Sequence, residues 1–318
     1  MIRDRLEMAL GVWMLLIVML PLTLLVATLT LRNADVMGRP ALIWIALFAW
    51  LVWQMIGLLA SHFAARKWAQ FLAPALLGLI ILFAWEVTVR AFVVPLVILP
   101  APSLIVVRFF SSLPILWSDF VQTFVKGALS GYLIGCGAAF LMAIMVDKSD
   151  FLRRGLLPVG NFVAALPIVG TAPILVMWFG FDWQSKAAVV VVMVFFPMLI
   201  NTVAGLREAS VMQRDLMKTY GASYWQGFFK LRLPAAMPFI FNGLKISTTL
   251  ALIGAIVAEF FGSPTVGMGF RISTSVGQLA LDMVWAEIIV AALAGSAFYG
   301  VVAIIEKGVT FWHPSQRG

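Results

Sequence analysis

The sequence predicts an all-α, polytopic membrane protein with about eight transmembrane helices. Of its 318 residues, 63% are hydrophobic and only 11% are charged, whereas a soluble domain usually carries about 25% charged residues. The mean hydropathy is +1.03. Because a bilayer core about 30 Å thick needs about 20 helical residues per crossing, a chain of this length and composition has room for roughly eight crossings joined by short loops.

Long apolar runs support this expectation. They are residues 8–31, 41–61, 69–98, 127–146, 155–181, 187–206, 235–261 and 288–305, and charged residues interrupt only the third and the seventh. The first run follows Arg3 and Arg5, as the core of a signal peptide would. It is too long for such a core, and no small-residue cleavage site follows it. We therefore expect it to be retained as a helix.

The distribution of lysine and arginine predicts the orientation. With the N-terminus inside, fifteen of these residues fall on the cytoplasmic side and seven on the other side, as the positive-inside rule requires. The sequence therefore predicts a bacterial inner-membrane protein with both termini in the cytoplasm. The same rule explains the net charge of +8, so we expect the lipid bilayer as partner and no nucleic acid.

Several kinds of chemistry are excluded by what the chain lacks. It contains one cysteine, Cys136, and two histidines far apart in sequence, His62 and His313, so neither a disulfide nor a metal site is expected. No Gly-Lys dipeptide occurs, which excludes the phosphate-binding loop of P-loop ATPases. We therefore expect no cofactor, no metal and no enzymatic activity in this chain.

Two connecting segments are unusually long. Residues 99–119 fall on the outer side and are predicted to form a lid or a short surface helix. Residues 207–234 fall on the cytoplasmic side, carry five of the fifteen inside charges and form the longest polar stretch of the chain. We therefore expect a soluble partner to bind to this second segment.

The local sequence of residues 207–234 predicts two short helices at an angle. Residues 209–220 fit a helix along the membrane face, and Gly221 fits the helix-ending position that needs a positive φ. Ser223 fits the N-cap of the next helix, and Pro234 favours a break before the following span. An ordinary amphipathic surface loop is the alternative.

The same segment carries a family motif. Asp215, a glycine six positions later at Gly221, a hydrophobic residue ten positions after that at Leu231, and then Leu233-Pro234 resemble the EAA loop of ABC importer permeases. The chain departs from that pattern where Asp215 stands for the usual glutamate and where Leu216 and Met217 replace two alanines. These larger side chains alter how the loop would seat on a partner.

Further segments resemble the branch of ABC permeases that serves sulfonate, taurine, nitrate and pyrimidine uptake. They occur in the same order and at similar spacing over about residues 70–312, and they are Leu99-Pro100-Ala101-Pro102-Ser103, Leu166-Pro167-Ile168, Trp178-Phe179-Gly180, Ser185-Lys186, Phe196-Pro197, Ala258-Glu259 and Gly267-Met268-Gly269-Phe270. Residues 1–67 fall outside the resemblance. The expected domains are thus an accessory pair of helices, 1–67, and a permease domain, 68–318, with six core helices.

The resemblance implies the function and the partners. The chain would be a permease subunit that forms the substrate path, pairs with a second permease, most simply as a homodimer, and receives substrate from an external substrate-binding protein. Two ATP-binding subunits would bind to the coupling loop, 207–234. The expected loop residues are Asp215, Leu216, Met217, Gly221, Ala222, Leu231, Leu233 and Pro234.

Charged and aromatic residues within the spans suggest further sites, because charges there are costly. Glu86 and Arg90 could form an ion pair or take part in transport, and Glu259 could gate the path or anchor the turn at residues 267–270. Lys126, Lys245 and Glu306 are expected to snorkel. The candidate path or gate residues are Met177, Trp178, Phe179, Asn201 and Glu259.

Two other classes of function were weighed. A secondary transporter driven by an ion gradient should show inverted repeats and carboxylates at mid-membrane, and no clear repeat is visible. An intramembrane enzyme would need a cluster of His, Asp or Cys at depth, which this sequence lacks.

Gly127, Gly131 and Gly135, at four-residue spacing, predict close helix packing rather than a functional site. The sequence leaves the substrate open.

Overall fold

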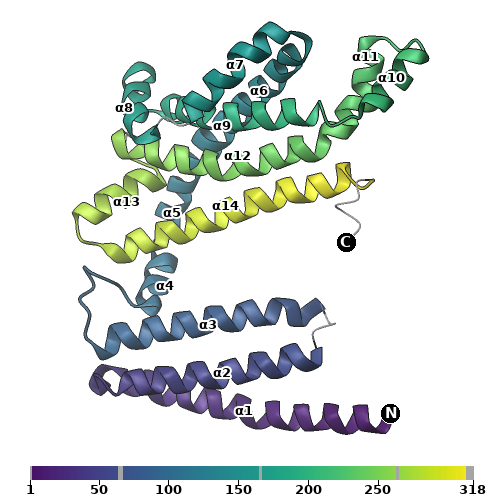
Figure 1. Cartoon of the computed structure of the whole chain (residues 1–318). Coiled ribbons are helices and arrows are strands. Elements are labelled where there is room, and N and C mark those ends of the chain that lie inside the picture. Colours follow the sequence, from purple (N-terminus) through teal and green to yellow (C-terminus); the bar gives the residue numbers. More distant parts are fainter. Residues whose placement is uncertain (1, 64–66, 165–166, 263–264, 313–318) are drawn as a thin grey trace. The chain divides into compact units, whose positions relative to one another are not determined.

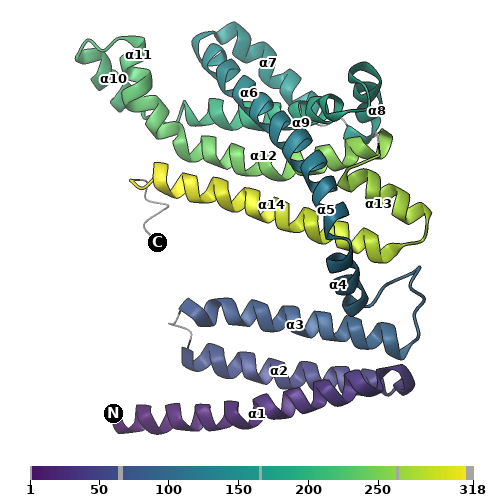
Figure 2. The ribbon, with the colours of Figure 1, turned by 180° about the vertical axis from the view of Figure 1, so that it is seen from behind.

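The computed structural model describes residues 2–63, 67–164, 167–262 and 265–312. These residues form helices joined by short loops, with no strand in the described ranges. Figures 1 and 2 show the helices from opposite sides. They divide into two compact units, Met1–Ser111 with Leu279–Asp282, and Ser112–Gln278 with Met283–Gly318. Each unit is described by itself.

The first unit contains three long helices and a short one. They are α1 (Ile2–Met37), α2 (Ala41–Phe63), α3 (Lys67–Ala91) and α4 (Pro102–Ser111). Phe48 and Val52 of α2 are buried against Phe83 and Val87 of α3, and the rings of Phe48 and Phe83 have centroids 3.9 Å apart. The basic link at residues 62–67 includes 64–66, which lie outside the described residues.

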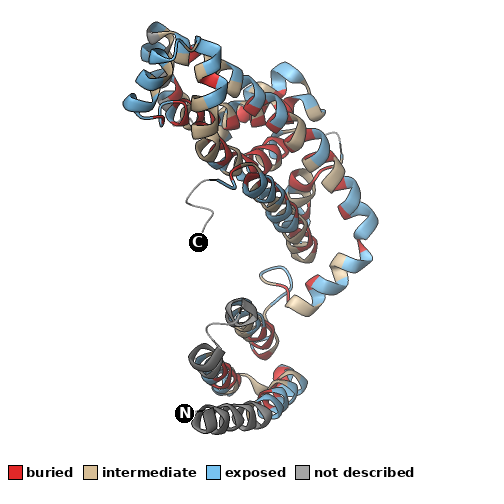
Figure 3. Ribbon diagram, turned by 90° about the vertical axis from the view of Figure 1, so that its right-hand side faces the viewer, coloured by how far each residue is buried: buried red, intermediate tan, exposed pale blue. Residues whose placement is uncertain are grey.

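The second unit begins with one long, nearly continuous helix. It comprises α5 (Leu113–Phe120), the π-helical segment η1 (Val121–Leu129) and α6 (Ser130–Lys148). Its remaining elements are α7 (Asp150–Ala164), α8 (Ile168–Phe179), α9 (Trp183–Gly205), α10 (Val211–Thr219), α11 (Tyr224–Gly227), the π-helical segment η2 (Phe228–Arg232), α12 (Leu233–Phe261), α13 (Met268–Gly277) and α14 (Leu281–Val309). In Figure 3 the buried positions lie where helices of a unit face each other.

The core of the second unit forms where α6, α9 and α12 meet. Small residues on α6 let it lie directly on α9: a Cβ placed on Gly131 would be 2.6 Å from Cβ of Val190, and one on Gly135 would touch Val194. Both glycines are buried. The sequence predicted close packing of this glycine repeat, and the structure shows that Gly131 and Gly135 pack within this chain.

The prediction of an all-α, polytopic membrane protein is confirmed. Five helical stretches among the described residues are long and apolar enough to cross a membrane, namely Pro74–Ala91, Leu113–Lys148, Trp183–Gly205, Tyr224–Phe261 and Leu281–Val309. Ala41–Gly57 and Ile168–Phe179 are shorter apolar helices. The count of eight crossings stays a prediction.

Two element predictions are wrong. Residues 155–181 do not form one span, because α7 ends at Ala164 and a separate helix, α8, begins after Pro167, whose backbone is extended. Proline lacks the N–H that a helix interior requires. Residues 99–119 were predicted to form a lid or a short surface helix. The short helix α4 agrees with this prediction, but α5 is continuous with the membrane-spanning helix that follows. Asp119 and Lys126 interrupt the hydropathy of that helix without interrupting its backbone.

The glycine contacts give a testable prediction. We expect Gly131→Ala to lower the thermal unfolding midpoint in detergent, because the new Cβ would be 2.7 Å from the backbone oxygen of Ala187, and overpacking of this kind costs about 1–3 kcal/mol. Gly137→Ala is the matched control. That glycine lies on the same helix with nothing within 4 Å, so alanine should stabilise by about 0.5–1 kcal/mol. Equal midpoints would contradict the packing described here.

Candidate functional site

The segment 207–234, called the elbow below, folds as two short helices joined by a tight turn. Ser210 caps α10, accepting a hydrogen bond from the amide of Gln213 at 3.2 Å, and the Gln213 side chain bonds back to the Ser210 amide. Ser223 and Gln226 repeat this arrangement at α11. Reciprocal capping satisfies amides that a helix start leaves unpaired, so both helices of the elbow have well-defined beginnings.

The turn between the two helices depends on Gly221. Its φ is +67°, a left-handed conformation that favours glycine. Its amide donates to the carbonyl of Lys218 at 2.9 Å, and the amide of Ala222 donates to Met217. The predictions for Gly221 and Ser223 are therefore confirmed. The predicted break at Pro234 is wrong, because α12 follows η2 directly.

The elbow is fixed at its base to two other helices. The Arg232 guanidinium forms an ion pair with Asp147 at the end of α6, with Nη1 donating to Oδ2 at 2.7 Å, and Nε donates to the carbonyl of Leu206 at 3.1 Å. The hydroxyl of Tyr224 donates to the same carboxylate at 3.0 Å. The ammonium of Lys148 lies 4.2 Å from the ring centroid of Trp225. A displacement of the elbow must therefore act directly on α6 and α9.

The outer surface of the elbow is exposed and carries both apolar and polar side chains. No residue of α10 is buried, and Met212 and Tyr220 are 83% and 81% exposed. Of the residues expected from the family motif, Asp215, Leu216 and Gly221 are exposed, and Asp215 pairs with Lys218 at 3.3 Å. The remaining ones are half-buried, and these are Met217, Ala222, Leu231, Leu233 and Pro234. Exposed apolar side chains on a rigid support are typical of a protein interaction surface.

A buried polar cluster lies at the opposite end of α12. The Glu259 carboxylate accepts hydrogen bonds from the hydroxyl of Thr123 at 2.8 and 2.9 Å and from the amide of Gly269 at 2.8 Å. The Thr123 hydroxyl in turn accepts from the amide of Met268 at 2.7 Å. A Cβ on Gly269 would collide with the carbonyl of Ile256. Glu259 thus holds the turn before α13, the anchoring role that the sequence suggested.

Asp119 joins the same cluster from α5. It is fully buried, and its carboxylate accepts from the amide of Gly267 at 2.6 Å and from Nε of Arg271 at 2.8 Å. Side chains that are satisfied within the protein therefore tie α5 and η1 to the end of α12 and the start of α13, which lie more than 130 positions later in the sequence. Buried charges are stable only when paired in this way.

Comparisons with known proteins now identify the family. The family model described as "Binding-protein-dependent transport system inner membrane component" matches residues 131–311, more than half of the chain. This range contains both the elbow and Glu259. The chain belongs to this family. It is thus a multi-pass membrane permease subunit of an ABC importer rather than a secondary transporter.

Relatives with similar sequences agree with this assignment. The formylaminopyrimidine transport permease protein ThiX of Halalkalibacterium halodurans is 29% identical over 78% of this permease and 98% of its own length. A probable ABC transporter permease protein of Haemophilus influenzae is 30% identical over 70% of this permease and 89% of its own length. The riboflavin transport system permease protein RibX of Chloroflexus aurantiacus is 29% identical, with coverage of 78% and 92%.

The path and gate residues proposed from sequence do not converge on one place in the permease. Trp178 and Phe179, at the end of α8, line an open cavity of about 610 Å³ against α9, and Met177 beside them is exposed. Asn201, on α9, accepts a hydrogen bond from Asn242 of α12 at 3.1 Å. Glu259 lies in the buried cluster.

Two ion pairs form between the charged residues that the sequence places within the spans. Glu86 and Arg90 form the ion pair that the sequence allowed, at 2.6 Å. The expectation that Lys245 and Glu306 snorkel is wrong, because the Lys245 ammonium lies 2.7 Å from the Glu306 carboxylate on α14. A paired charge inside the protein avoids the cost of exposure to hydrocarbon. Lys126 is exposed, as snorkelling would require.

Sequence reasoning missed the partners of these residues. Asp119, Thr123, Asp147 and Arg271 were not identified as site residues, although Asp119 and Thr123 are four positions apart, which places them on one helix face. Glu287 was also missed. It is fully buried in α14, and its carboxylate has no hydrogen-bond partner among the described residues.

The Glu259 cluster gives the second prediction. We expect Glu259→Gln to fold and transport better than Glu259→Ala, because the amide oxygen of glutamine can still accept from Gly269 or Thr123. Alanine would leave both donors buried and unpaired, and each such group costs about 1–3 kcal/mol. Unfolding midpoints in detergent and uptake in cells, at matched expression, measure the difference. Equal and complete loss in both variants would instead indicate an essential negative charge.

Proposed function

We propose that a separate ATP-binding subunit docks on the elbow of this permease and moves it during the cycle of ATP binding and hydrolysis. The observation that supports it best is that α10 exposes apolar side chains, while Arg232 ties the other end of the elbow to α6 and α9. The exposed face of α10 would fill a groove on the ATP-binding subunit. In this proposal Asp215, Leu216, Met217, Gly221 and Ala222 shape the contact.

The continuity of the helices supplies a route for the motion. Tyr224–Phe261 is one continuous helical stretch, so a tilt of α11 would be carried along α12 toward Glu259, while the Arg232–Asp147 pair would carry the same tilt to α6. Leu231, Leu233 and Pro234 lie where these helices join. Alternating access would follow if closure of the ATP-binding subunits moves the elbow and reorients these spans.

The proposed assembly has two permeases, two ATP-binding subunits and an external substrate-binding protein, with the permeases as a homodimer. We place both termini and the elbow on the cytoplasmic side, following the lysine and arginine counts. The proposed path residues are Met177, Trp178, Phe179 and Asn201. Glu259 is the proposed gate residue, which acts by anchoring the neighbouring turn. The permease domain would be 68–318, and residues 1–67 an accessory helix pair.

The substrate is proposed to be a small, water-soluble organic compound of the kind that the relatives' names describe, such as a pyrimidine or a vitamin. Selection would rest largely with the binding protein. The ligand that copurifies with the binding protein encoded beside this permease would identify it, and transport of that ligand only when the permease is present would confirm the pairing.

The third prediction tests the elbow through its backbone. Gly221→Val places a β-branched residue at φ +67°, which costs about 1–2 kcal/mol or moves the elbow. We expect this variant to insert in the membrane but to lose ATP-binding subunit in detergent pull-down and to lose uptake. Gly227→Val is the matched control. Gly227 also has nothing within 4 Å but has φ −63°, so valine should be accommodated there with binding largely retained.

The size of the effect should also differ along the elbow. Asp215→Ala should weaken binding of the ATP-binding subunit less than Gly221→Val does, because an exposed ion pair contributes little. Wild-type binding and uptake in Gly221→Val would contradict the assignment of the elbow.

The fourth prediction concerns the accessory helices. Deleting residues 1–67 should leave measurable uptake, because no transport motif lies there. The Arg90–Glu86 pair and α4 remain in the truncated chain. Uptake in cells is compared with the full chain at equal membrane abundance. A truncated permease that inserts and binds the ATP-binding subunit, yet transports nothing, would show that the accessory role is wrong.

A further inference from the structure

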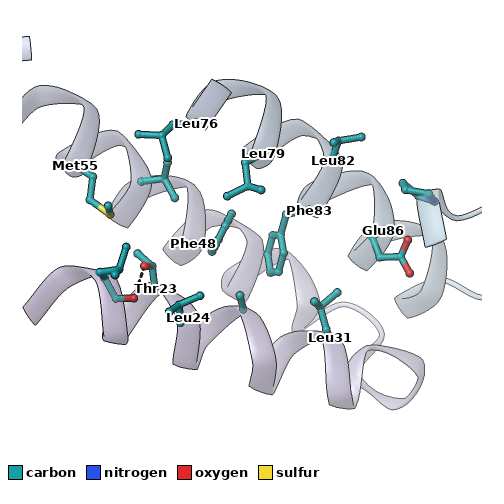
Figure 4. Close-up of a pocket in the computed structure, with 14 residues that line it drawn as sticks. Thr23, Leu24, Leu31, Phe48, Met55, Leu76, Leu79, Leu82, Phe83 and Glu86 are labelled. Atoms are coloured by element: carbon teal, nitrogen blue, oxygen red, sulfur yellow. Dashed lines mark hydrogen bonds between the residues drawn. The ribbon is translucent and has the colours of Figure 1, made fainter. Parts of the chain in front are cut away.

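The permease has a polar cavity in addition to the apolar one in its first unit. Figure 4 shows the apolar cavity, where side chains such as Leu24, Phe48 and Leu79 form most of the wall. The polar cavity belongs to the second unit, lies between α12 and α14, and has a volume of about 370 Å³. Four of its described lining residues are polar, and they are Asn242, Lys245, Thr249 and Tyr299. Ligand pockets of about 300–1,000 Å³ usually carry a few polar groups of this kind.

The polar lining lies near the middle of two long helices. α12 and α14 run side by side in Figures 1 and 2, and the Lys245 ammonium lies 2.7 Å from the Glu306 carboxylate. Asn242, Lys245 and Thr249 follow one another at three- and four-residue spacing, which places them on one face of α12. Thr249 and Tyr299 are close to the midpoints of helices of 29 residues each. They are therefore at the depth of the hydrocarbon core.

Several hydrogen-bonding groups of this lining are unused. Asn242, Thr249 and Tyr299 are exposed, and the hydroxyls of Thr249 and Tyr299 make no hydrogen bond to any residue that the structure describes. Hydrocarbon offers such groups no partner, so polar side chains within a membrane usually face another helix or a water-filled space. The cavity supplies that space. We therefore expect it to hold water, and with it a polar solute, rather than lipid.

The orientation of two asparagines shows what the cavity offers a solute. The Asn201 amide donates to the carbonyl of Pro197 at 2.8 Å, so its Oδ1 is left to accept from Nδ2 of Asn242 at 3.1 Å. The side-chain oxygen of Asn242 is then an acceptor for an N–H group, and the hydroxyls of Thr249 and Tyr299 can each donate or accept. The ring of Tyr299, 47% exposed, adds a flat surface on which another ring can stack.

The charge of the lining excludes one class of solute. Lys245 is the only charged residue among the described residues that line the cavity. Its ammonium is paired with Glu306 at 2.7 Å, and the two side chains are 20% and 10% exposed. The pair leaves the cavity without net charge. An organic anion at this depth would stay uncompensated or would have to displace the Glu306 carboxylate, and both are costly in a membrane. An uncharged solute meets no such cost.

We propose that the cavity between α12 and α14 is a substrate-contact site on the transport path, and that it takes an uncharged heterocyclic compound rather than an organic anion. Asn242 accepts an N–H group of the ring, and the hydroxyls of Thr249 and Tyr299 bind its carbonyl or ring nitrogen atoms. This inference rests on the proposed function, because it makes the cavity part of the path, and it narrows the class of substrate.

The first experiment measures whether the cavity is open to water. Cys136 is the only cysteine of the chain, so Cys136→Ala gives a background without thiols, into which Thr249→Cys is introduced. Native membrane vesicles receive, on both sides, methanethiosulfonate ethylsulfonate, an anion, or methanethiosulfonate ethylammonium, a cation, and labelling is followed by the mass of the permease. Both reagents attack the thiolate, which forms in water and not in apolar surroundings. We therefore expect Thr249→Cys to be labelled at least about tenfold faster than a thiol that faces lipid.

Val301→Cys in the same background is the matched control. Val301 is 54% exposed, does not line the cavity, and lies two positions from Tyr299, which is about 200° round the helix. It is also near the depth of Thr249, because α12 and α14 are antiparallel and the two residues are five and four positions from the members of the ion pair that joins these helices. Equally slow labelling at both positions would overturn the proposal, because lipid or a second copy of the chain would then cover the cavity.

The second experiment measures the charge of the site. At Thr249→Cys, each labelling rate is divided by the rate of the same reagent with a free thiol in solution, and we expect nearly equal values for the anionic and the cationic reagent. A path for organic anions would favour the anionic reagent about tenfold or more, and that result would overturn the proposed class of substrate.

Adding Glu306→Gln to Thr249→Cys tests the ion pair itself. Lys245 then lacks its counterion, and labelling by the anionic reagent should rise about tenfold relative to the cationic one. If that variant does not insert, Lys245→Gln should shift the ratio about as far in favour of the cationic reagent. An unchanged ratio would show that the pair does not set the charge of the cavity, and would overturn the proposed class of substrate.

Neither labelling rate depends on docking of the ATP-binding subunit at the elbow. Slow labelling at Thr249→Cys in a permease that still retains the ATP-binding subunit in pull-down would therefore reject the cavity as a substrate site and leave the elbow assignment intact. Wild-type binding and uptake in Gly221→Val would reject the elbow assignment and leave both labelling rates as they are.

Discussion

Polar groups in this protein have to be paired within the protein, because the hydrocarbon around the spans offers them no partner. An unpaired charge there is costly, and the chain pairs its buried charges across helices. Glu259 binds Thr123 and Gly269, Asp119 binds Arg271, and Lys245 binds Glu306. Glu287 is the exception among the described residues. Each pair fixes the rotation of one helix against another.

The same constraint positions the two ends of α12. At one end, Arg232 binds Asp147 and the carbonyl of Leu206, so the elbow cannot turn without α6 and α9. At the other end, Glu259 holds the turn before α13. Between them the helix is continuous, and small residues such as Gly243 and Gly254 let α9 approach closely. A long helix that is fixed at both ends transmits a displacement better than one that is broken at Pro234 would.

The two units differ in how they are held together. The second has charged pairs that link helices far apart in sequence, together with glycine contacts that leave little room for change. The first depends mostly on apolar side chains, together with the Glu86–Arg90 ion pair and its hydrogen bond to Ser103. Apolar contacts inside a membrane gain little over contacts with lipid.

The sequence alone determined the features that depend on neighbouring residues. Apolar runs predicted the membrane-spanning helices, and Ser210 with Gln213, Gly221, and Ser223 with Gln226 determined the elbow, because capping and turn formation involve residues three or four positions apart. The spacing of Asp215, Gly221 and Leu231 also predicted the family. Only the tertiary structure decided that Asp119 meets Arg271, 152 positions away, and that Arg232 meets Asp147, 85 positions away. Such pairs depend on how each helix is rotated and packed, and hydropathy reports neither, so Asp119 and Lys126 were interpreted as the end of a loop although they lie within one long helix.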